Sequence, residues 1–152
     1  MKPKLLVVEL WGIGDLAIAT PFLHAASQKY EVTVLAKPYA VDLQARFWPD
    51  VKVVTFNAPW TAFTHKYRFW SWRWSDIWKL RRRLAAERFD FGVSARWGDP
   101  RDHFLLRLFR VKKRIGFPWL GKGIFLNAPL SAPEAPTAPA TNGVEMASST
   151  PA

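Results

Sequence analysis

The sequence predicts an α/β fold, with a Rossmann-like parallel sheet that carries helices on both faces. Short apolar runs typical of buried strands alternate with segments whose apolar residues recur at helical spacing, and most connections are short. The first apolar run also ends in a glycine-containing turn that leads directly into a helix, as in the first unit of such folds. The chain has 152 residues, of which 49% are apolar, and this is enough for one domain with a substantial core.

The first unit comes from the beginning of the chain. Leu5–Val8 is an apolar run typical of a buried strand, and a helix is predicted from Asp15 to Lys29. Gly12 and Gly14 separate the two, and we expect them to allow a positive φ or the close approach of another group. Asp15 is a good N-cap, because its carboxylate can accept from the free N–H groups of the first turn. In a second interpretation this carboxylate projects into the crevice at the end of the strand and does chemistry.

The same alternation continues along the chain. Further strands are predicted at Glu31–Ala36, Val51–Phe56, Phe89–Ala95 and Lys113–Phe117. Further helices are predicted at Tyr39–Phe47, from about Ser71 to Arg88, and from Gly98 onward. Asn57–Phe69 has no clear period and is expected to be a long loop. Together these elements predict a parallel sheet of about five strands.

Composition divides the chain into one domain and a tail. Residues 1–130 are expected to form the Rossmann-like domain. Residues 131–152 are rich in Pro, Ala, Ser and Thr, and such a segment cannot bury enough apolar surface to fold. We therefore expect a disordered tail.

Charge and residue usage restrict the partners and the location. The net charge of +10 favours an anionic partner or surface. Cysteine is absent, which excludes disulfides and thiolate metal sites and fits a cytoplasmic location. Glu9 and Asp15 interrupt the first apolar run too early for a signal peptide, and no run is long enough to span a membrane. The histidines have no partners at metal-ligand spacing, so no metal site is expected. No cofactor is expected either.

One predicted helix combines tryptophan with arginine. Its candidate membrane-surface residues are Trp74, Trp78, Arg81, Arg82 and Arg83. Spacing places Trp70, Trp74, Ile77, Trp78 and Leu84 near one face. In one interpretation the helix packs on the sheet and its arginine face is solvated. In the other it attaches to an anionic membrane surface, at the inner face of the cytoplasmic membrane. Nucleic-acid binding uses similar residues, but no recognisable nucleic-acid module accompanies them, so it is not expected.

The glycine turn also fits a dinucleotide-binding fingerprint. Gly12–Ala17 has the form G-x-G-x-x-[GA] in the right place after a strand. Asp15 would, however, face the pyrophosphate at the helix start, and Lys37 stands where an acidic ribose ligand is expected. Because Lys37 suits a 2′-phosphate, an NADP-binding domain of an oxidoreductase remains an alternative.

The same residues carry a different resemblance. The stretch Glu9–Leu16, read as Glu-Leu-Trp-Gly-Ile-Gly-Asp-Leu and followed by Ala19-Thr20-Pro21, resembles the opening of glycosyltransferase family 9, the heptosyltransferases of lipopolysaccharide core assembly. The resemblance continues to the Arg-Ile-Gly-Phe element at 114–117. It implies one half of a GT-B fold, in which two Rossmann-like domains enclose the active site. The first domain of that family binds a sugar-lipid acceptor, and the second binds a nucleotide-sugar donor.

The resemblance also assigns roles to residues. It implies that Asp15 is the catalytic base, which takes the proton from the acceptor hydroxyl as that oxygen attacks the anomeric carbon with inversion. A carboxylate at a glycine-lined turn is held in place and reachable, as a general base must be. Gly12, Gly14 and Arg96 are the candidate acceptor-binding residues, with Arg96 as a phosphate or sugar contact. A surface ion pair between Arg96 and Asp99 is the alternative for that arginine.

The second domain of the family has no counterpart in this sequence. We therefore expect a truncated or split transferase or a remnant of one, inactive by itself, with the donor bound only where a second domain is supplied. A non-catalytic domain that binds a membrane surface is a further alternative.

Overall fold

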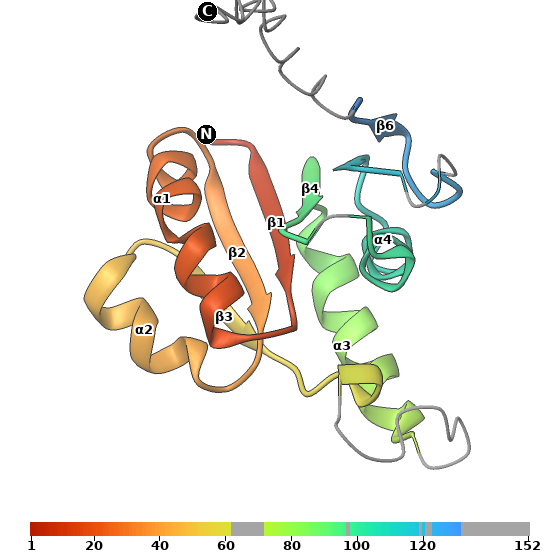
Figure 1. Cartoon of the computed structure of the whole chain (residues 1–152), viewed down its shortest axis with the longest axis horizontal. Coiled ribbons are helices and arrows are strands. Elements are labelled where there is room, and N and C mark those ends of the chain that lie inside the picture. Colours follow the sequence, from red (N-terminus) through yellow and green to blue (C-terminus); the bar gives the residue numbers. More distant parts are fainter. Residues whose placement is uncertain (62–71, 97, 119, 121–122, 132–152) are drawn as a thin grey trace, which may run out of the picture.

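A parallel sheet of six strands lies at the centre of the computed structural model, which describes residues 1–61, 72–96, 98–118, 120 and 123–131 (Figure 1). The strand order is β3-β2-β1-β4-β5-β6, and every pairing is parallel. The strands are β1 (Lys4–Glu9), β2 (Glu31–Ala36), β3 (Lys52–Thr55), β4 (Phe91–Ser94), β5 (Lys113–Gly116) and β6 (Ala128–Pro129). The predicted α/β, Rossmann-like fold class is confirmed.

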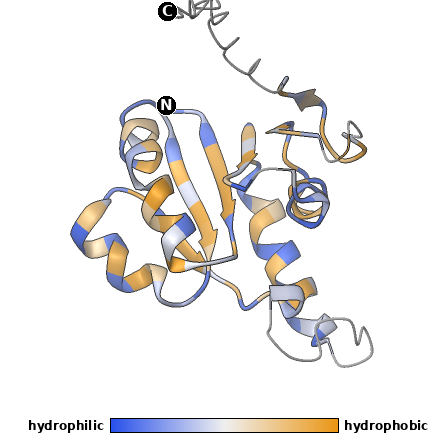
Figure 2. Cartoon of the chain, in the orientation of Figure 1, coloured by the Kyte–Doolittle hydropathy of each residue, from blue (hydrophilic) through white to orange (hydrophobic). Residues whose placement is uncertain are grey.

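Two layers of helices cover the sheet. Alternate residues of β1 point to opposite faces, so Leu5 and Val7 belong to one core cluster and Leu6 and Val8 to another. The first cluster also holds buried residues of α1 (Ile13–Lys29) and α2 (Ala40–Phe47). The second holds buried residues of α3 (Trp74–Glu87) and α4 (Pro100–Leu108). Because β1 and β2 are buried on both faces, they are hydrophobic along most of their length (Figure 2).

The chain order of the strands creates a switch point. From β1 the chain proceeds outward through β2 to β3, and then returns to the other side of β1 to form β4, β5 and β6. The connections after β1 and β4 therefore leave the sheet in opposite directions. In open α/β sheets this arrangement opens a crevice at the carboxyl ends of the strands, where ligands bind.

Helix α3 differs from the sequence prediction in its start and in its buried face. It begins at Trp74, whereas Ser71 lies outside the described residues. Its buried residues are Ile77, Leu80 and Leu84, at positions i, i+3 and i+7. Trp74 is 49% exposed and Trp78 is 55% exposed, so these two residues do not share the buried face of Ile77 and Leu84 as predicted. Trp70, the remaining member of the predicted face, lies outside the described residues. Of the predicted loop at 57–69, residues 59–61 form a short 3-10 helix, η1 (Pro59–Thr61), and residues 62–69 lie outside the described part.

A sixth strand extends the sheet beyond the prediction. The two residues of β6 pair with Ile115 and Gly116 of β5. The side chain of Asn127 supports this pairing, since its Oδ1 accepts from the Arg114 N–H at 2.7 Å and its Nδ2 donates to the Lys112 carbonyl at 2.7 Å. Of the predicted tail, residues 132–152 lie outside the described part, and its disorder stays a prediction.

Candidate functional site

The turn between β1 and α1 holds the predicted catalytic residue. Helix α1 begins at Ile13, and Gly12 is its N-cap with an extended backbone at φ −129°. Asp15 therefore lies inside the first turn as an exposed residue and is not the N-cap that the sequence predicts. Neither Gly12 nor Gly14 has a positive φ, so the part of the expectation that concerns backbone conformation is wrong. The helix dipole nevertheless favours a negative charge in this first turn.

Gly12 has a role that concerns space and not backbone conformation. A Cβ atom built on Gly12 would lie 3.2 Å from Oδ2 of Asp15, which is closer than usual for such a contact. A Cβ on Gly14 would meet nothing within 4 Å. The two glycines thus leave room beside the Asp15 carboxylate and in front of the turn, as an approaching ligand would require.

Glu9 is a buried carboxyl at the end of β1 that the sequence analysis did not identify. It is 1% exposed, and its Oε1 accepts from the Trp11 N–H at 3.0 Å. Its Oε2 has no hydrogen-bond partner among the described residues. Burial raises the pKa of the Glu9 carboxyl above its ordinary value, although the bond from Trp11 opposes this shift. The available signal was a charged residue that ends an otherwise apolar buried strand.

Two residues after β2 complete this side of the site. Nζ of Lys37 donates to the Trp11 carbonyl at 2.8 Å and so ties the end of β2 to the β1–α1 turn. The Tyr39 hydroxyl is buried, and it has no hydrogen-bond partner in the part of the chain that the structure describes. Burial raises the pKa of Tyr39, and the charges of Glu9 and Asp15 raise it further. Tyr39 therefore lies close enough to both carboxylates for their charges to affect its pKa.

Arg96 follows β4 on the other side of the switch point. Its guanidinium carbon lies 3.9 Å from the ring centroid of Trp11, and that of Arg101 lies 5.0 Å from the same centroid. Asp99 caps α4 through the Arg101 N–H at 2.9 Å and pairs with the Arg101 guanidinium at 3.0 Å. The predicted alternative, an ion pair between Arg96 and Asp99, is therefore wrong. Within the described residues Arg96 forms no ion pair, and it is exposed.

A second buried carboxyl lies on α4. Asp102 is 0% exposed, and its Oδ2 accepts from Oγ of Ser94 at 3.3 Å, whereas its Oδ1 has no partner among the described residues. Burial, followed by the charges of Asp99 and Glu9, raises the pKa of Asp102 to about 7. Neither Asp102 nor Glu9 was predicted as part of the site.

His103 follows Asp102 and is also buried. A Cβ on Gly116 would lie 2.8 Å from its Nε2, so β5 can end beside the imidazole only because residue 116 is glycine. Burial lowers the pKa of His103, which favours the neutral ring. The described residues contain no group of three side chains that could hold a metal ion.

The carboxyl edge therefore combines an exposed carboxylate with an exposed guanidinium. Asp15 follows β1 and Arg96 follows β4, the two strands that flank the switch point. The Trp11 ring holds the guanidinium, and buried carboxyls lie at the end of β1 and in α4. Such an arrangement can accept a proton at Asp15 and bind an anionic or hydroxyl-rich ligand at Arg96.

The candidate membrane-surface residues lie on α3, and Trp74, at the start of this helix, lines a pocket together with Arg101. Trp74 is 49% exposed, and Arg82 and Arg83 are exposed. The guanidinium carbon of Arg81 lies 5.0 Å from the ring centroid of Trp78. Every helix in the described part of the chain is too short or too polar to cross a bilayer.

Comparisons with known proteins identify the fold. No family model and no curated protein matches the chain. A glycosyl transferase family 9 structure from Veillonella parvula DSM 2008 is similar at a TM-score of 0.59 and 13% identity, over 79% of this chain and 33% of that one. The ADP-heptose lps heptosyltransferase II of E. coli is similar at a TM-score of 0.58 and 17% identity, over 82% of this chain and 33% of that one. The chain thus spans about a third of the length of these structures and shares the fold of the part that it matches. At the level of the fold, the predicted resemblance to glycosyltransferase family 9 is confirmed.

Proposed function

We propose that this chain is the acceptor-binding half of a heptosyltransferase-type glycosyltransferase. The whole enzyme would transfer a sugar from a nucleotide-sugar donor to a lipopolysaccharide-type acceptor. The observation that carries the proposal is the position of Asp15, an exposed carboxylate at the carboxyl edge of a sheet whose fold matches two glycosyltransferase structures. Because the chain spans about a third of those structures, the proposal assigns donor binding to a second domain.

Asp15 acts as the general base in this proposal. Its carboxylate takes the proton from an acceptor hydroxyl while that oxygen forms a bond to the anomeric carbon of the donor sugar. The bond from the anomeric carbon to the nucleotide phosphate breaks at the same time, and the configuration inverts. Gly12 supports this role because it leaves the space beside Oδ2 free of a side chain.

Arg96 and Gly14 bind the acceptor in this proposal. The guanidinium rests on the Trp11 ring and has no carboxylate partner among the described residues, so it is available to a phosphate or a sugar hydroxyl. The open space in front of Gly14 allows the acceptor to approach the turn. Lys37 is engaged with the Trp11 carbonyl, which argues against its use for the 2′-phosphate of NADP.

The experiment is a transfer assay with a donor-binding domain supplied as a separate chain. Asp15→Asn should lower transfer about 100- to 10,000-fold, the usual range for loss of a general base, and should leave acceptor affinity nearly unchanged. Asp42→Asn is the matched control, because Asp42 is also an exposed aspartate in the first turn of a helix. Equal transfer by both variants would remove Asp15 as the base. Micromolar binding of NADPH that is lost in Lys37→Glu would favour an oxidoreductase domain instead.

The proposal also places α3 at an anionic membrane surface, through Trp74, Trp78, Arg81, Arg82 and Arg83. Half-exposed tryptophan beside exposed arginine is the composition that such a surface binds. Each basic residue near an anionic surface contributes on the order of 1 kcal/mol. This attachment would keep the protein in the cytoplasm at the inner face of the cytoplasmic membrane.

Co-sedimentation with anionic vesicles tests the attachment. Arg82→Gln/Arg83→Gln should weaken binding strongly, and the binding of the unmodified chain should fall as salt increases. The control Lys29→Gln/Arg46→Gln removes the same charge from exposed positions on α1 and α2. Equal loss in both variants would show that only net charge matters and would refute a membrane-facing α3.

A further inference from the structure

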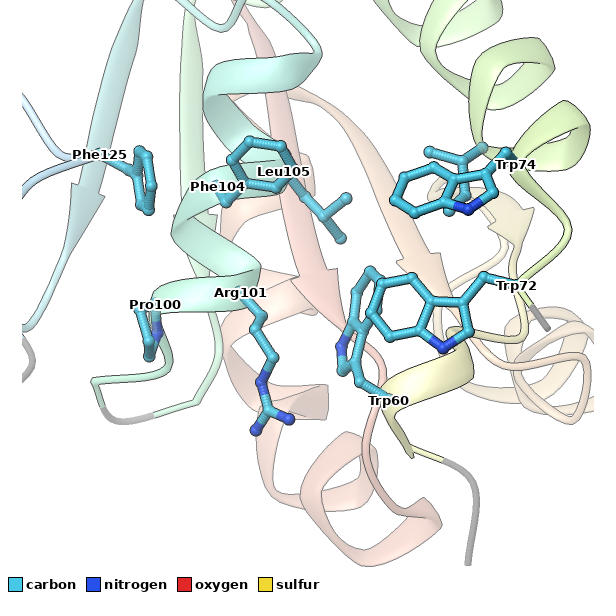
Figure 3. Close-up of a pocket in the computed structure, with 9 residues that line it drawn as sticks. Trp60, Trp72, Trp74, Pro100, Arg101, Phe104, Leu105 and Phe125 are labelled. Carbon is cyan, nitrogen blue, oxygen red and sulfur yellow. The ribbon is translucent and has the colours of Figure 1, made fainter. Parts of the chain in front are cut away.

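An apolar cavity of about 310 Å³ lies between η1 and α3 on one side and α4 on the other (Figure 3). Trp60, Trp72 and Trp74 form one wall. Phe104 and Phe125 stand opposite, with the Arg101 side chain below them in this view. A cavity of this volume is at the lower end of the range for small-molecule sites.

The aromatic walls are held by contacts among themselves. The ring centroids of Trp60 and Trp72 are 5.5 Å apart, and those of Trp72 and Trp74 are 5.6 Å apart. On the opposite wall Phe104 and Phe125 meet edge to face at 5.4 Å. The cavity is therefore formed before any ligand binds, which lowers the entropic cost of binding.

Apolar surface remains exposed at the cavity. Phe104 is 45% exposed and Trp74 is 49% exposed. Leaving such rings in water is unfavourable, and a ligand that covers them would recover roughly 25 cal/mol per Å² of apolar area. A sugar ring would suit these walls poorly, because its hydroxyls would lose water without gaining hydrogen-bond partners.

A cationic region adjoins the cavity. Arg101 lines the cavity and also lies against the Trp11 ring that carries Arg96. Asp99 neutralises Arg101 locally, whereas Arg96 has no carboxylate partner among the described residues. An apolar cavity beside an uncompensated guanidinium is complementary to a molecule with an apolar chain and an anionic group.

We propose that this cavity binds an acyl chain of an anionic amphiphile, whose anionic group lies at Arg96 and Arg101. The inference rests on the proposed function and deepens it, since the amphiphile is the lipid part of the acceptor. Trp74 belongs both to the cavity and to the exposed surface of α3 that we assign to the membrane. An acyl chain that leaves the bilayer beside α3 therefore enters the cavity directly. The anionic group of the same amphiphile then comes to lie toward the carboxyl edge.

Calorimetric titration of the full chain with dodecyl phosphate, below its critical micelle concentration, tests the proposal. We expect micromolar binding of dodecyl phosphate. Butyl phosphate and inorganic phosphate, which supply the anionic group alone, should bind at least ten-fold more weakly. Dodecyl maltoside, which supplies the chain with a neutral head, should also bind more weakly. Equal affinity for dodecyl phosphate and butyl phosphate would overturn the acyl-chain site and leave a simple anion site.

A pair of matched variants locates the binding. Phe104→Asp places a carboxylate in the cavity wall and should weaken dodecyl phosphate binding at least ten-fold. Phe22→Asp makes the same change on α1 at a residue of nearly equal exposure, 47% against 45%, and should bind as the unmodified chain does. Phe104→Ser serves as a second cavity variant, and far-UV circular dichroism checks that each protein folds. Equal binding by the Phe104 and Phe22 variants would refute the assignment to this cavity.

The result is separable from the proposed transfer reaction. Binding of dodecyl phosphate requires neither donor nor catalysis, so Asp15→Asn should bind it with unchanged affinity. Loss of transfer with retained amphiphile binding would contradict the enzymatic role alone. Transfer that proceeds while the cavity fails to bind dodecyl phosphate would contradict the acyl-chain site alone.

Discussion

The two edges of the sheet formed by the amino ends and by the carboxyl ends of the strands differ in how their charged side chains are paired. At the amino edge charged side chains neutralise one another: Glu87 pairs with Lys4 at 3.1 Å and with Lys52 at 2.6 Å, and Asp90 pairs with Lys112 at 2.7 Å. Hydrogen bonds from these lysines lower the pKa of Glu87 and of Asp90. Glu87 and Asp90 thus each have lysine partners at this edge, which stabilises the charged form of both carboxyls.

The carboxyl edge holds buried polar atoms without partners. Oε2 of Glu9, the Tyr39 hydroxyl and Oδ1 of Asp102 have no hydrogen-bond partner in the described residues. Burial raises the pKa of both carboxyls, the reverse of the shift at the amino edge. Buried polar groups are nearly always satisfied in folded proteins, so a cluster of exceptions marks a place where stability gives way to another requirement. In open α/β sheets, ligands bind at the carboxyl ends of the strands beside the switch point.

The largest expected effect concerns Asp102. Its pKa is about 7 in the folded state against 3.8 in the reference state, so the folded protein binds more protons between these values and loses stability as the pH rises through them. About three pH units correspond to at most about 4 kcal/mol at 1.36 kcal/mol per unit. Asp102→Asn should therefore stabilise the protein at pH 8 by up to this amount and leave it nearly unchanged at pH 4. Urea unfolding at both pH values measures the difference, and equal effects at pH 4 and pH 8 would contradict a buried, titrating Asp102.

Glu9 offers a smaller effect of the same sign. The pKa of Glu9 is raised in the folded state, so ionising this carboxyl is unfavourable there. The protein therefore loses stability as the pH rises from the unfolded-state pKa through the folded-state pKa. Glu9→Gln removes the charge and should stabilise the protein by about 1–2 kcal/mol at pH 8, with a smaller gain at pH 4. Thermal melts at the two pH values provide the measurement. Destabilisation at pH 8 would show that the carboxylate is satisfied and would weaken the contrast between the edges.

Glu87 should respond to the same substitution with the opposite sign. Glu87→Gln removes two lysine partners and should cost about 0.5–1 kcal/mol, because partly exposed ion pairs are weak. The pKa of Glu87 is lowered in the folded state, so this contribution is present above the unfolded pKa and is lost as the pH falls through the folded one. Chemical unfolding at low and high salt should show the cost shrinking with salt. Glu31→Gln, an exposed residue at the amino end of β2, is the control and should change little.

Arg96 should show the smallest effect on stability. It is exposed and stacks on Trp11, so Arg96→Gln should change the free energy of unfolding by less than about 0.5 kcal/mol. The same variant should bind a phosphorylated sugar acceptor at least several-fold more weakly, as measured by calorimetry. Arg46→Gln, an exposed arginine of α2, is the control. Unchanged acceptor binding in Arg96→Gln would remove this residue from the site.

The sequence predicts the architecture well because the signals for it are local. The buried strands β1 and β2 are apolar along most of their length, and the connections that follow β1, β2, α2 and β4 contain glycine or proline. The strand β6 has only two residues, and it depends on the Asn127 side chain to bridge two backbone groups of the neighbouring segment. That bridge joins positions far apart in sequence, so no local pattern indicates it.

The candidate site is predicted only in part, for a related reason. Asp15 follows a recognisable turn, and its place in the first helical turn is close to the predicted one. Charged residues such as Glu9 and Asp102 ordinarily stay exposed. Glu9 ends an apolar run, which is a weak local sign of burial, and Asp102 has no such sign. Their burial results from the packing of β1, β4 and α4 against one another. The sequence therefore identifies the exposed carboxylate of the candidate site and misses the two buried ones.

The short strand β6 has a consequence for how copies of this protein meet. Leu130 donates its N–H to the Gly116 carbonyl at 2.8 Å, toward β5, so the neighbouring residue in the strand turns its nitrogen to the open side. That residue is Pro129, whose nitrogen carries no hydrogen. Pro129 offers no N–H donor to a strand from another molecule. If such a strand paired here, one of its own carbonyl groups would lack a hydrogen-bond partner. Within the described residues, Pro129 thus removes one of the donors through which another strand could pair with β6.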